Sequence, residues 1–369
     1  MRRPVLLSAA FVLIVTGMAG AEDRIAVDAR INNRPVHLAF DTGADSPVLF
    51  PGAASRLGLK TNEMRFTEEC TLAFGKRSQR TMFGVLDTPS YLPLDIDGFL
   101  SWTAVSNRVF QLDVERRICR VSDDVPPDLG GWARWKLVTD SPVLIFECSN
   151  DVEVTRIGID TGFPTGIMLS PERWQKWRAA RAGQPSTVAI RWSPGEALSV
   201  TEVLRARKIE LGGLTLNDVP VIKATPKFDM LFRHSDAVFG LYALRQLKVV
   251  MDGRSGTLYM SPITHASGHY DYNHAGVDFV PKDPDKSDDL VARVIEGGPA
   301  YRAGVRDDDI LLRIGRVDAT QWRTIWPKMR RTKPGQLEGK PGTKLKLTLQ
   351  RGRQRYETTV TLEDLPMVD

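Results

Sequence analysis

The chain has 369 residues, a formal net charge of +5, 42% hydrophobic residues and 26% charged residues. This composition is that of an ordinary folded protein and excludes a largely disordered chain, and the modest charge indicates no particular partner. The length allows two or three domains. The basic clusters at 328–331 and 351–355 contain no aromatic residues for base stacking, so we expect solvated turns and helix faces there rather than a nucleic-acid site.

Residues 1–21 have the pattern of a signal peptide. Arg2 and Arg3 precede an apolar run from Val5 to Val15 that is too short to span a bilayer comfortably, and a small-x-small cleavage site, Ala-Gly-Ala, follows at 19–21. No Cys follows the run, which argues against a lipid anchor. We expect this segment to be removed, leaving an exported protein, periplasmic or secreted, with no stable membrane span. An uncleaved anchor is the alternative.

The tripeptide Asp-Thr-Gly occurs twice, at 41–43 and, 119 residues later, at 160–162. In both places a short apolar strand leads to the tripeptide, a second strand leaves it, and a helix begins at a Pro. A further pair of segments, DGFLS at 97–101 and DAVFG at 236–240, is 139 residues apart, and each of these leads into a hairpin. We therefore predict two homologous lobes of mostly β structure, residues 22–125 and 138–262, with a linker at 126–137.

Two facing Asp-Thr-Gly turns would create a distinctive chemical site. The Gly allows close backbone packing, the Thr can bond across to the partner turn, and the two Asp side chains would lie within a few ångström. Carboxylates at that separation share a proton and titrate as a pair. The ionised member can take a proton from water while the protonated member polarises a carbonyl, so each lobe supplies half of a hydrolytic site.

On these motifs, residues 23–262 resemble aspartic peptidases of the pepsin/retropepsin superfamily. The resemblance rests on Asp41-Thr42-Gly43-Ala44, on Asp160-Thr161-Gly162, and on the apolar segments at 99–101 and 238–240 that run beneath the two loops in that family. It implies a catalytic dyad of Asp41 and Asp160, a polypeptide substrate, water as the nucleophile, and neither a cofactor nor a metal. The residues that it implies as loop support are Thr42, Gly43, Ala44, Thr161 and Gly162.

The chain departs from the family pattern at two positions. Phe163 follows the second tripeptide, where a small or hydroxyl-bearing residue is common, and Ser101 stands where the family has Gly. Neither Ala44 nor Phe163 can donate a side-chain hydrogen bond to a carboxylate, so we expect a pH optimum in mildly acidic to near-neutral conditions. A dyad that has lost its activity is the alternative.

A lid over the cleft is expected in lobe two. Residues 187–192 and 197–204 are predicted to form a long hairpin with turn residues at 193–196, whereas lobe one offers only the short segment 61–70. A surface hairpin with no lid role is the alternative.

Residues 270–366 resemble a PDZ domain, on the run Pro299-Ala300-x-x-Ala303-Gly304-Val305 and on the Asp-Ile-Leu-x-x-Ile-Gly that ends at Gly315. The resemblance implies an extended peptide or a protein C-terminus beside a sheet edge. The implied carboxylate-binding loop is Gly276, Val277, Asp278 and Phe279. Because Asp278 would repel a carboxylate, docking of an internal segment or of the chain itself is an alternative, as is a purely structural role.

Other chemistries find little support in the sequence. There is no Gly-x-Ser-x-Gly, no plausible Ser-His-Asp set and no His-Glu-x-x-His. We interpret His265, His269 and His274 with Asp271 as a polar linker rather than a metal site. Of the three cysteines, Cys70 and Cys119 could pair within one lobe, and no spacing enforces it.

The fold class that we predict is mainly β: a two-lobed aspartic-protease fold with duplicated lobes, followed by a PDZ domain. The function that we predict is an exported aspartic endopeptidase with a PDZ domain for peptide docking or regulation. A non-catalytic peptide-binding protein with a degenerate protease fold is the alternative. Activity only as a homodimer is less favoured, because one chain already carries both half-sites.

Overall fold

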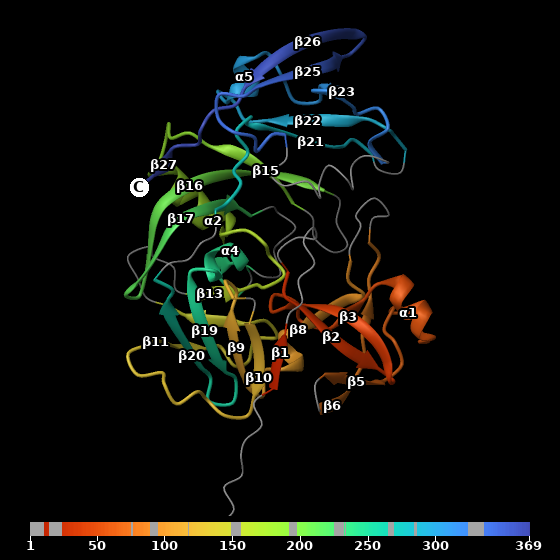
Figure 1. Cartoon of the computed structure of the whole chain (residues 1–369), viewed down its shortest axis with the longest axis vertical. Coiled ribbons are helices and arrows are strands. Elements are labelled where there is room, and N and C mark those ends of the chain that lie inside the picture. Colours follow the sequence, from red (N-terminus) through yellow and green to blue (C-terminus); the bar gives the residue numbers. More distant parts are fainter. Residues whose placement is uncertain are drawn as a thin grey trace, which may run out of the picture.

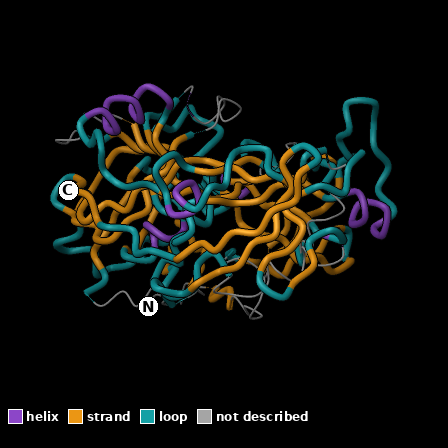
Figure 2. Tube along the Cα trace, turned by 90° about the horizontal axis from the view of Figure 1, so that it is seen from above, coloured by secondary structure: helices purple, strands orange, loops and turns teal. Residues whose placement is uncertain are grey.

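The computed structural model describes residues 11–14, 24–74, 77–88, 95–116, 118–148, 156–191, 198–224, 232, 234–264, 269–283, 286–323 and 336–369. The fold is mainly β, as predicted, and strands run through the whole molecule with only a few short helices between them (Figure 2). Within these described ranges the strands belong to three sheets.

The first sheet is built from lobe one and has the strand order β6-β5-β2-β3-β8-β4-β7. Its strands are β2 (Ala26–Ile31), β3 (Arg34–Asp41), β4 (Val48–Leu49), β5 (Cys70–Phe74), β6 (Arg77–Thr81), β7 (Gly84–Val85) and β8 (Gly98–Ser101). Helix α1 (Pro51–Leu57) follows β4 and buries Ala53, Ala54 and Leu57. A 3-10 turn, η1 (Trp102–Ala104), follows β8.

The second sheet joins the two lobes, in the order β1-β10-β9-β19-β20-β11-β12-β13-β18-β14-β17-β16-β15, with β27 beside β16. The strands from lobe one and the N-terminus are β1 (Phe11–Ile14), β9 (Val109–Asp113) and β10 (Ile118–Ser122). The other strands are β11 (Ala133–Leu137), β12 (Ile145–Glu147), β13 (Arg156–Ile159), β14 (Ile167–Leu169), β15 (Thr187–Arg191), β16 (Ser199–Leu211), β17 (Leu214–Lys223), β18 (Ala237–Phe239), β19 (Leu247–Asp252), β20 (Thr257–Pro262) and β27 (Met367–Val368).

Helices α2 (Pro171–Ala179) and α4 (Leu241–Leu244) belong to lobe two. The Ser170 hydroxyl caps α2 by accepting from the Arg173 N–H at 3.3 Å, and Pro171 occupies the first turn. Trp174 and Trp177 of this helix are buried in the hydrophobic core. The helix ends at Ala179.

The pairing of strands repeats between the lobes. In lobe one β3 runs parallel to β8 with Leu38 opposite Gly98, and in lobe two β13 runs parallel to β18 with Ile157 opposite Ala237. These partners are related by the same 119- and 139-residue spacings that relate the sequence motifs. Two lobes with one strand arrangement are therefore present, as the repeated motifs predict.

The two lobes meet where β9 pairs with β19 in a symmetric register. Asp113 lies opposite Lys248, Gln111 opposite Val250, and Val109 opposite Asp252. A single hydrophobic core also runs through both lobes, with the Phe40 and Phe110 rings stacked at 4.5 Å within it. The predicted linker at 126–137 is shorter than expected, because β11 occupies its last five residues and pairs with β12 and β20.

The third sheet, called here the C-terminal sheet, has the order β21-β22-β23-β25-β26, with β24 beside β23. It lies at the top of Figure 1, above β15 and β16. Its elements are β21 (Val277–Pro281), β22 (Leu290–Val294), helix α5 (Pro299–Arg302), β23 (Ile310–Ile314), β24 (Val317–Asp318), β25 (Lys344–Arg351) and β26 (Gln354–Thr361).

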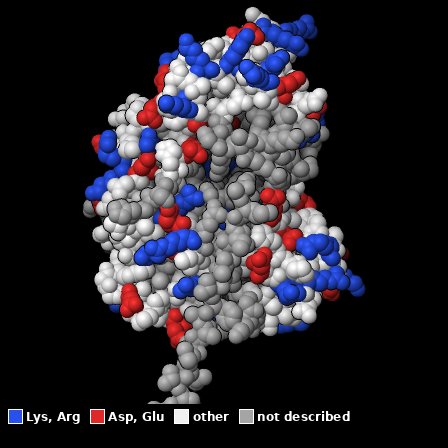
Figure 3. Space-filling model, viewed as in Figure 1, with Lys and Arg blue, Asp and Glu red and all other residues white. Residues whose placement is uncertain are grey.

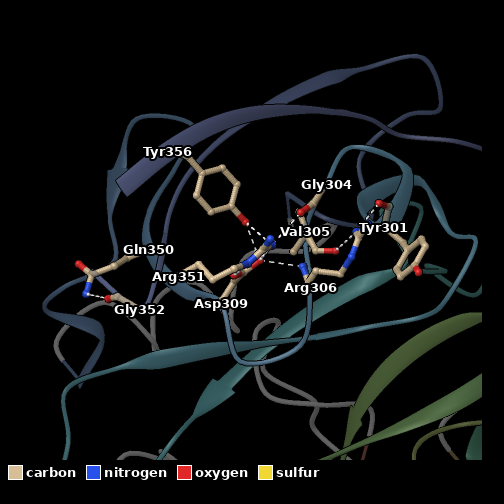
Figure 4. Close-up of polar contacts among 9 residues, drawn as sticks. All are labelled: Tyr301, Gly304, Val305, Arg306, Asp309, Gln350, Arg351, Gly352 and Tyr356. Carbon is tan, nitrogen blue, oxygen red and sulfur yellow. Dashed lines mark hydrogen bonds and ion pairs between the residues drawn. The ribbon is translucent and has the colours of Figure 1, made fainter. Parts of the chain in front are cut away.

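A buried carboxylate holds this sheet together (Figure 4). The Asp309 side chain is fully buried and accepts from Arg351 Nε and Nη2 at 2.7 and 2.8 Å and from the Tyr356 hydroxyl at 2.5 Å. Burial alone would raise the pKa of Asp309, but the hydrogen bonds from Arg351 and Tyr356 outweigh it and hold the pKa below its usual range. Arg351 is therefore part of an internal network and not simply a solvated turn residue.

Charged side chains of both signs cover the face in Figure 3, with Lys and Arg gathered at the top over β25 and β26. Lys344, Arg353 and Arg355 are exposed there, and Lys346 pairs with Glu357 at 2.8 Å. The other basic cluster, at 328–331, lies outside the described residues.

The C-terminal sheet is fastened to lobe two by the chain segments before and after it. Tyr272 before the sheet and Leu365 after it are buried in one cluster with Phe163 and Met168 of lobe two. The last strand, β27, pairs with β16, with Arg205 opposite Met367.

The N-terminal segment, a membrane-spanning helix and the cysteines were also subjects of the sequence predictions. Most of residues 1–21 lies outside the described residues, apart from β1, which pairs with β10. Within the described ranges no helix has the length and hydropathy needed to cross a membrane. Cys70, Cys119 and Cys148 are all buried free thiols.

Candidate active site

The two Asp-Thr-Gly turns lie where the lobes meet. Asp41 is the last residue of β3, which runs parallel to β8, and Asp160 comes directly after β13, which runs parallel to β18, so each carboxyl group stands at the same place in its own lobe. Beneath the turns run β8 and β18, the apolar segments that the sequence singled out. The structure thus brings all seven predicted dyad and loop residues together: Asp41, Thr42, Gly43, Ala44, Asp160, Thr161 and Gly162.

The two threonines bond the turns to each other reciprocally. The Thr42 N–H donates to Thr161 Oγ1 and the Thr161 N–H donates to Thr42 Oγ1, both at 3.1 Å. The Thr42 hydroxyl donates to the carbonyl of Ile159 at 2.6 Å, and the Thr161 hydroxyl donates to that of Phe40 at 2.7 Å. Both threonines are fully buried, so four hydrogen bonds in a dry environment fix the relative position of the lobes.

The carboxyl groups are placed with the same reciprocity. The Gly43 N–H donates to Asp41 Oδ1 at 3.0 Å, and the Gly162 N–H donates to Asp160 Oδ1 at 2.8 Å. A Cβ on Gly43 would lie 2.5 Å from Cγ of Asp160, and a Cβ on Gly162 would lie 2.5 Å from Cγ of Asp41. Each carboxyl therefore occupies the space that the absent side chain of the opposite Gly leaves open.

This proximity perturbs the protonation of both groups. Burial raises the pKa of Asp160 well above its usual range, and the charge of Asp41 and the hydrogen bond with it raise this pKa further. Burial also raises the pKa of Asp41, while its hydrogen bond with Asp160 acts in the opposite direction. The pair therefore favours a state in which one carboxyl is protonated and the other ionised, as two carboxyl groups in contact must.

Two arginines that the motifs did not indicate add positive charge. Arg24 lowers the pKa of Asp41, and Arg191 lowers that of Asp160, each against the larger effect of burial. The Arg191 guanidinium carbon lies 4.7 Å from the centre of the Phe163 ring, and that of Arg24 lies 5.8 Å from the centre of the Phe99 ring. Neither arginine belongs to a recognisable motif, because each reaches the turns only through the fold.

The two departures from the family pattern are explained by packing. In lobe two, a Cβ on Gly240 would lie 2.4 Å from the carbonyl oxygen of Thr165, 2.5 Å from that of Phe163 and 2.6 Å from Cδ1 of the Phe163 ring, so the loop and its large ring pack directly on this Gly. In lobe one, Ala44 is small, and Ser101 fits fully buried with its Oγ 2.7 Å from Thr103 Oγ1. Phe163 itself is buried against Tyr272 and Leu365, the segments that flank the C-terminal sheet.

The predicted lid hairpin exists as β15 and β16, with Val188 opposite Glu202 and Arg191 opposite Ser199. Its tip, residues 192–197, lies outside the described residues, so the predicted position of Pro194 and Gly195 over the cleft stays a prediction.

The four residues predicted to bind a carboxylate, Gly276 to Phe279, are not part of this site and lie at the start of β21. Two of their amides already have side-chain acceptors inside the chain. The Gly276 N–H donates to Asn273 Oδ1 at 3.0 Å, and the Phe279 N–H donates to Asp278 Oδ1 at 2.9 Å. Asn273 was missed by the sequence reasoning, since a lone Asn in a linker carries no signal.

In the part of the chain that the structure describes, His269, Asp271 and His274 do not form a cluster that could hold a metal ion. His274 Nδ1 lies 2.8 Å from the carbonyl oxygen of Glu363, and His265 lies outside the described residues. No cluster of three or more His, Cys, Asp or Glu side chains suited to a metal occurs among the described residues.

Comparison with known proteins gives one match. The family model described as aspartyl protease matches residues 27–97, which include the first Asp-Thr-Gly and most of the first sheet. No curated protein matches the chain. The match supports a protease-type function with a polypeptide substrate, and the second half-site rests on the geometry of lobe two.

Proposed function

We propose that the protein is an exported aspartic endopeptidase that hydrolyses peptide bonds with a water molecule activated between Asp41 and Asp160. The observation that carries the proposal is the reciprocal geometry of the two turns. Each Thr bonds to the opposite turn, and each carboxyl lies against the opposite Gly. Together with the aspartyl protease match over lobe one, this arrangement favours a working dyad over a fold that keeps only its shape.

In this mechanism the dyad begins with one proton. The ionised carboxylate accepts a proton from water as the water oxygen bonds to the scissile carbonyl carbon. The protonated carboxyl gives its proton to the carbonyl oxygen, which produces a neutral tetrahedral diol. The C–N bond then breaks as the nitrogen takes a proton from the dyad and the diol returns one, so the dyad ends with the single proton it started with.

The β15–β16 hairpin is proposed to cover the bound peptide. Supporting this role, Arg191 at the end of β15 already lies over Phe163, three residues after Asp160. A closed hairpin would exclude bulk water and offer backbone groups to an extended substrate.

The C-terminal sheet is proposed to be a PDZ-type domain whose role is regulatory docking within the chain. A free C-terminus would need the loop amides at 276–279, and Asn273 and Asp278 already accept two of them. Asp278 is also buried, and its carboxylate accepts from one of the loop amides that a ligand's carboxylate would need.

Export is proposed from the signal-peptide pattern of residues 1–21. Expression in a bacterial host followed by cell fractionation and N-terminal sequencing tests it. A mature chain beginning near residue 22 in the periplasm or medium is expected, and an intact N-terminus in the cytoplasmic fraction would contradict it.

The experiment that tests the function is hydrolysis of a denatured protein by purified residues 22–369. We expect cleavage that a transition-state-mimicking aspartic-protease inhibitor blocks, and we expect Asp41→Asn to abolish it. Asp45→Asn is the matched control, because Asp45 is an exposed carboxylate four residues away. Cleavage that persists at wild-type rates in Asp41→Asn would refute the proposal.

A further inference from the structure

Strand β15 lies between the catalytic lobe and the C-terminal sheet. Ala189 packs against the cluster that contains Phe163 and Met168, whereas Ile190 packs against the core of the C-terminal sheet. Successive side chains of a strand point to opposite faces, so the two faces of β15 serve two different cores. Leu198, just before β16, also packs against the C-terminal sheet. Figure 1 shows β15 directly beneath β21 and β22.

On the catalytic face, Arg191 connects β15 to the loop that carries Asp160. The Arg191 side chain is buried, stacks on Phe163 at 4.7 Å, and has Nη1 2.7 Å from Met168 Sδ. Met168 lies on β14, which leaves the catalytic turn. A shift of β15 would therefore move a buried positive charge relative to the dyad.

At the other end of the strand, polar contacts tie the start of β15 to the segment that leads into β21. The Thr187 hydroxyl donates to the carbonyl of Asn273 at 2.6 Å. The Asn273 side chain accepts from the amides of Ala275 and Gly276, both at 3.0 Å, and donates to the carbonyl of Val277 at 2.9 Å. Strand β21 ends its sheet in the strand order, and both β15 and β16 contact it.

We propose that the C-terminal sheet holds β15 in place and, through the contact of Arg191 with Phe163, sets the pH range in which the dyad works. Arg191 acts as a positioning residue: it contacts Phe163, and its charge acts on Asp160 across the catalytic loop. The inference rests on the proposed function, because it needs an active dyad.

The direction of the effect follows from the charges around the dyad. Asp41 and Arg191 act on Asp160, and Arg24 acts on Asp41. Arg191 also acts on the buried Tyr270, which has Glu338, Tyr242 and Asp271 as further charged or titratable neighbours. Arg191 opposes the rise that burial imposes on the pKa of Asp160. Withdrawing this charge therefore raises that pKa further. Because Asp160 is the member with the higher pKa and holds the shared proton, the alkaline limb of kcat/KM moves to higher pH, by about one unit.

Two variants of the full mature chain test the proposal. Arg191→Gln removes the charge directly, and Ile190→Gln loosens β15 from the C-terminal sheet without adding a charge. We expect both to move the alkaline limb upward by about one unit, and the double variant to move it no further than Arg191→Gln alone. Ile190→Val is the conservative control, and Thr359→Gln is a control on the exposed surface of the same sheet. An unshifted profile in Ile190→Gln would overturn the proposal.

Amide hydrogen exchange gives a second readout that needs no activity. Ile190→Gln should speed exchange both in β15 and in peptides covering residues 160–170, because the catalytic loop loses its support. If the wild type hydrolyses nothing, the proposed function fails. The exchange measurement still tests whether the C-terminal sheet positions the catalytic loop. Unchanged exchange at 160–170 in Ile190→Gln would show that the C-terminal sheet does not position the loop.

Discussion

Thr42 and Thr161 each donate a backbone N–H to the other's hydroxyl oxygen at 3.1 Å, so one pair of residues carries the contact between the two half-sites. Each hydroxyl also donates onward to a carbonyl on the opposite strand, at Ile159 or Phe40. The position of Asp41 relative to Asp160 therefore depends on a closed set of buried bonds that neither lobe can form alone.

Thr161→Val should destabilise the protein substantially. The substitution keeps the shape of the side chain but leaves the buried Thr42 N–H and the Phe40 carbonyl without their partner, at a cost of about 2–4 kcal/mol. Urea unfolding followed by fluorescence measures this cost. Thr359→Val, at an exposed position of β26, should change stability by no more than about 0.5 kcal/mol. Equal effects of the two substitutions would argue against the role of the paired threonines.

Gly43→Ala should inactivate the enzyme while most of the fold survives. The new Cβ would lie 2.5 Å from the carboxyl carbon of Asp160, which must then move. A displacement of about 1 Å at reacting groups costs roughly a hundredfold in kcat. Gly52→Ala is the matched control, since a Cβ at this position in α1 meets nothing within 4 Å. Wild-type kcat in Gly43→Ala would contradict the proposed contact between the half-sites.

The pH profile of kcat/KM should have its maximum in mildly acidic to near-neutral conditions. Activity requires one ionised carboxyl, and burial raises the pKa of both members, so ionisation is completed at higher pH than for ordinary aspartates. Ala44→Ser adds a hydroxyl that can donate to the ionised form, which lowers the pKa and moves the acid limb to lower pH. A maximum in strong acid that Ala44→Ser leaves unmoved would show that other groups control the dyad.

Acid should weaken the C-terminal sheet through Asp309. Its folded-state pKa is lowered, so its contribution to stability is present above the usual aspartate pKa of about 4 and is lost as the pH falls below it. Asp309→Asn should cost about 1.5–3 kcal/mol at neutral pH, because the buried side chain loses its charge-assisted hydrogen bonds with the half-exposed Arg351, and should remove this part of the acid sensitivity. Hydrogen exchange of β23 and β25 between pH 3 and pH 7 measures both effects. Exchange in the variant that keeps the wild-type pH dependence would contradict the assignment.

The repeated motifs indicated the duplication, and the structure brings together the two Asp-Thr-Gly turns from which the dyad is predicted. The turn requires Asp, Thr and Gly at three consecutive positions, so it can be recognised in the sequence. The parallel pairings Leu38–Gly98 and Ile157–Ala237 have the same spacings as the sequence motifs. Local signals of this kind survive in the chain because the backbone geometry at the turns demands them.

The residues around the dyad could not be predicted in the same way. Arg191 contacts Phe163, and Asn273 receives a bond from Thr187, only because segments distant in sequence pack together. Strand β11 was not predicted from the sequence for a similar reason, since its pairing partners in β20 lie more than a hundred residues away. Such contacts depend on tertiary packing, which overrides local propensity and leaves no short motif.

The most direct test of the central claim is the rate of peptide hydrolysis by Asp160→Asn, because the aspartyl protease match at 27–97 does not include this half of the site. With a folded variant, shown by an unchanged far-UV spectrum and melting curve, we predict a loss on the order of a thousandfold or more, equal to that in Asp41→Asn and no greater in the double variant. Hydrolysis by Asp160→Asn at close to the wild-type rate would contradict a site shared between the two lobes.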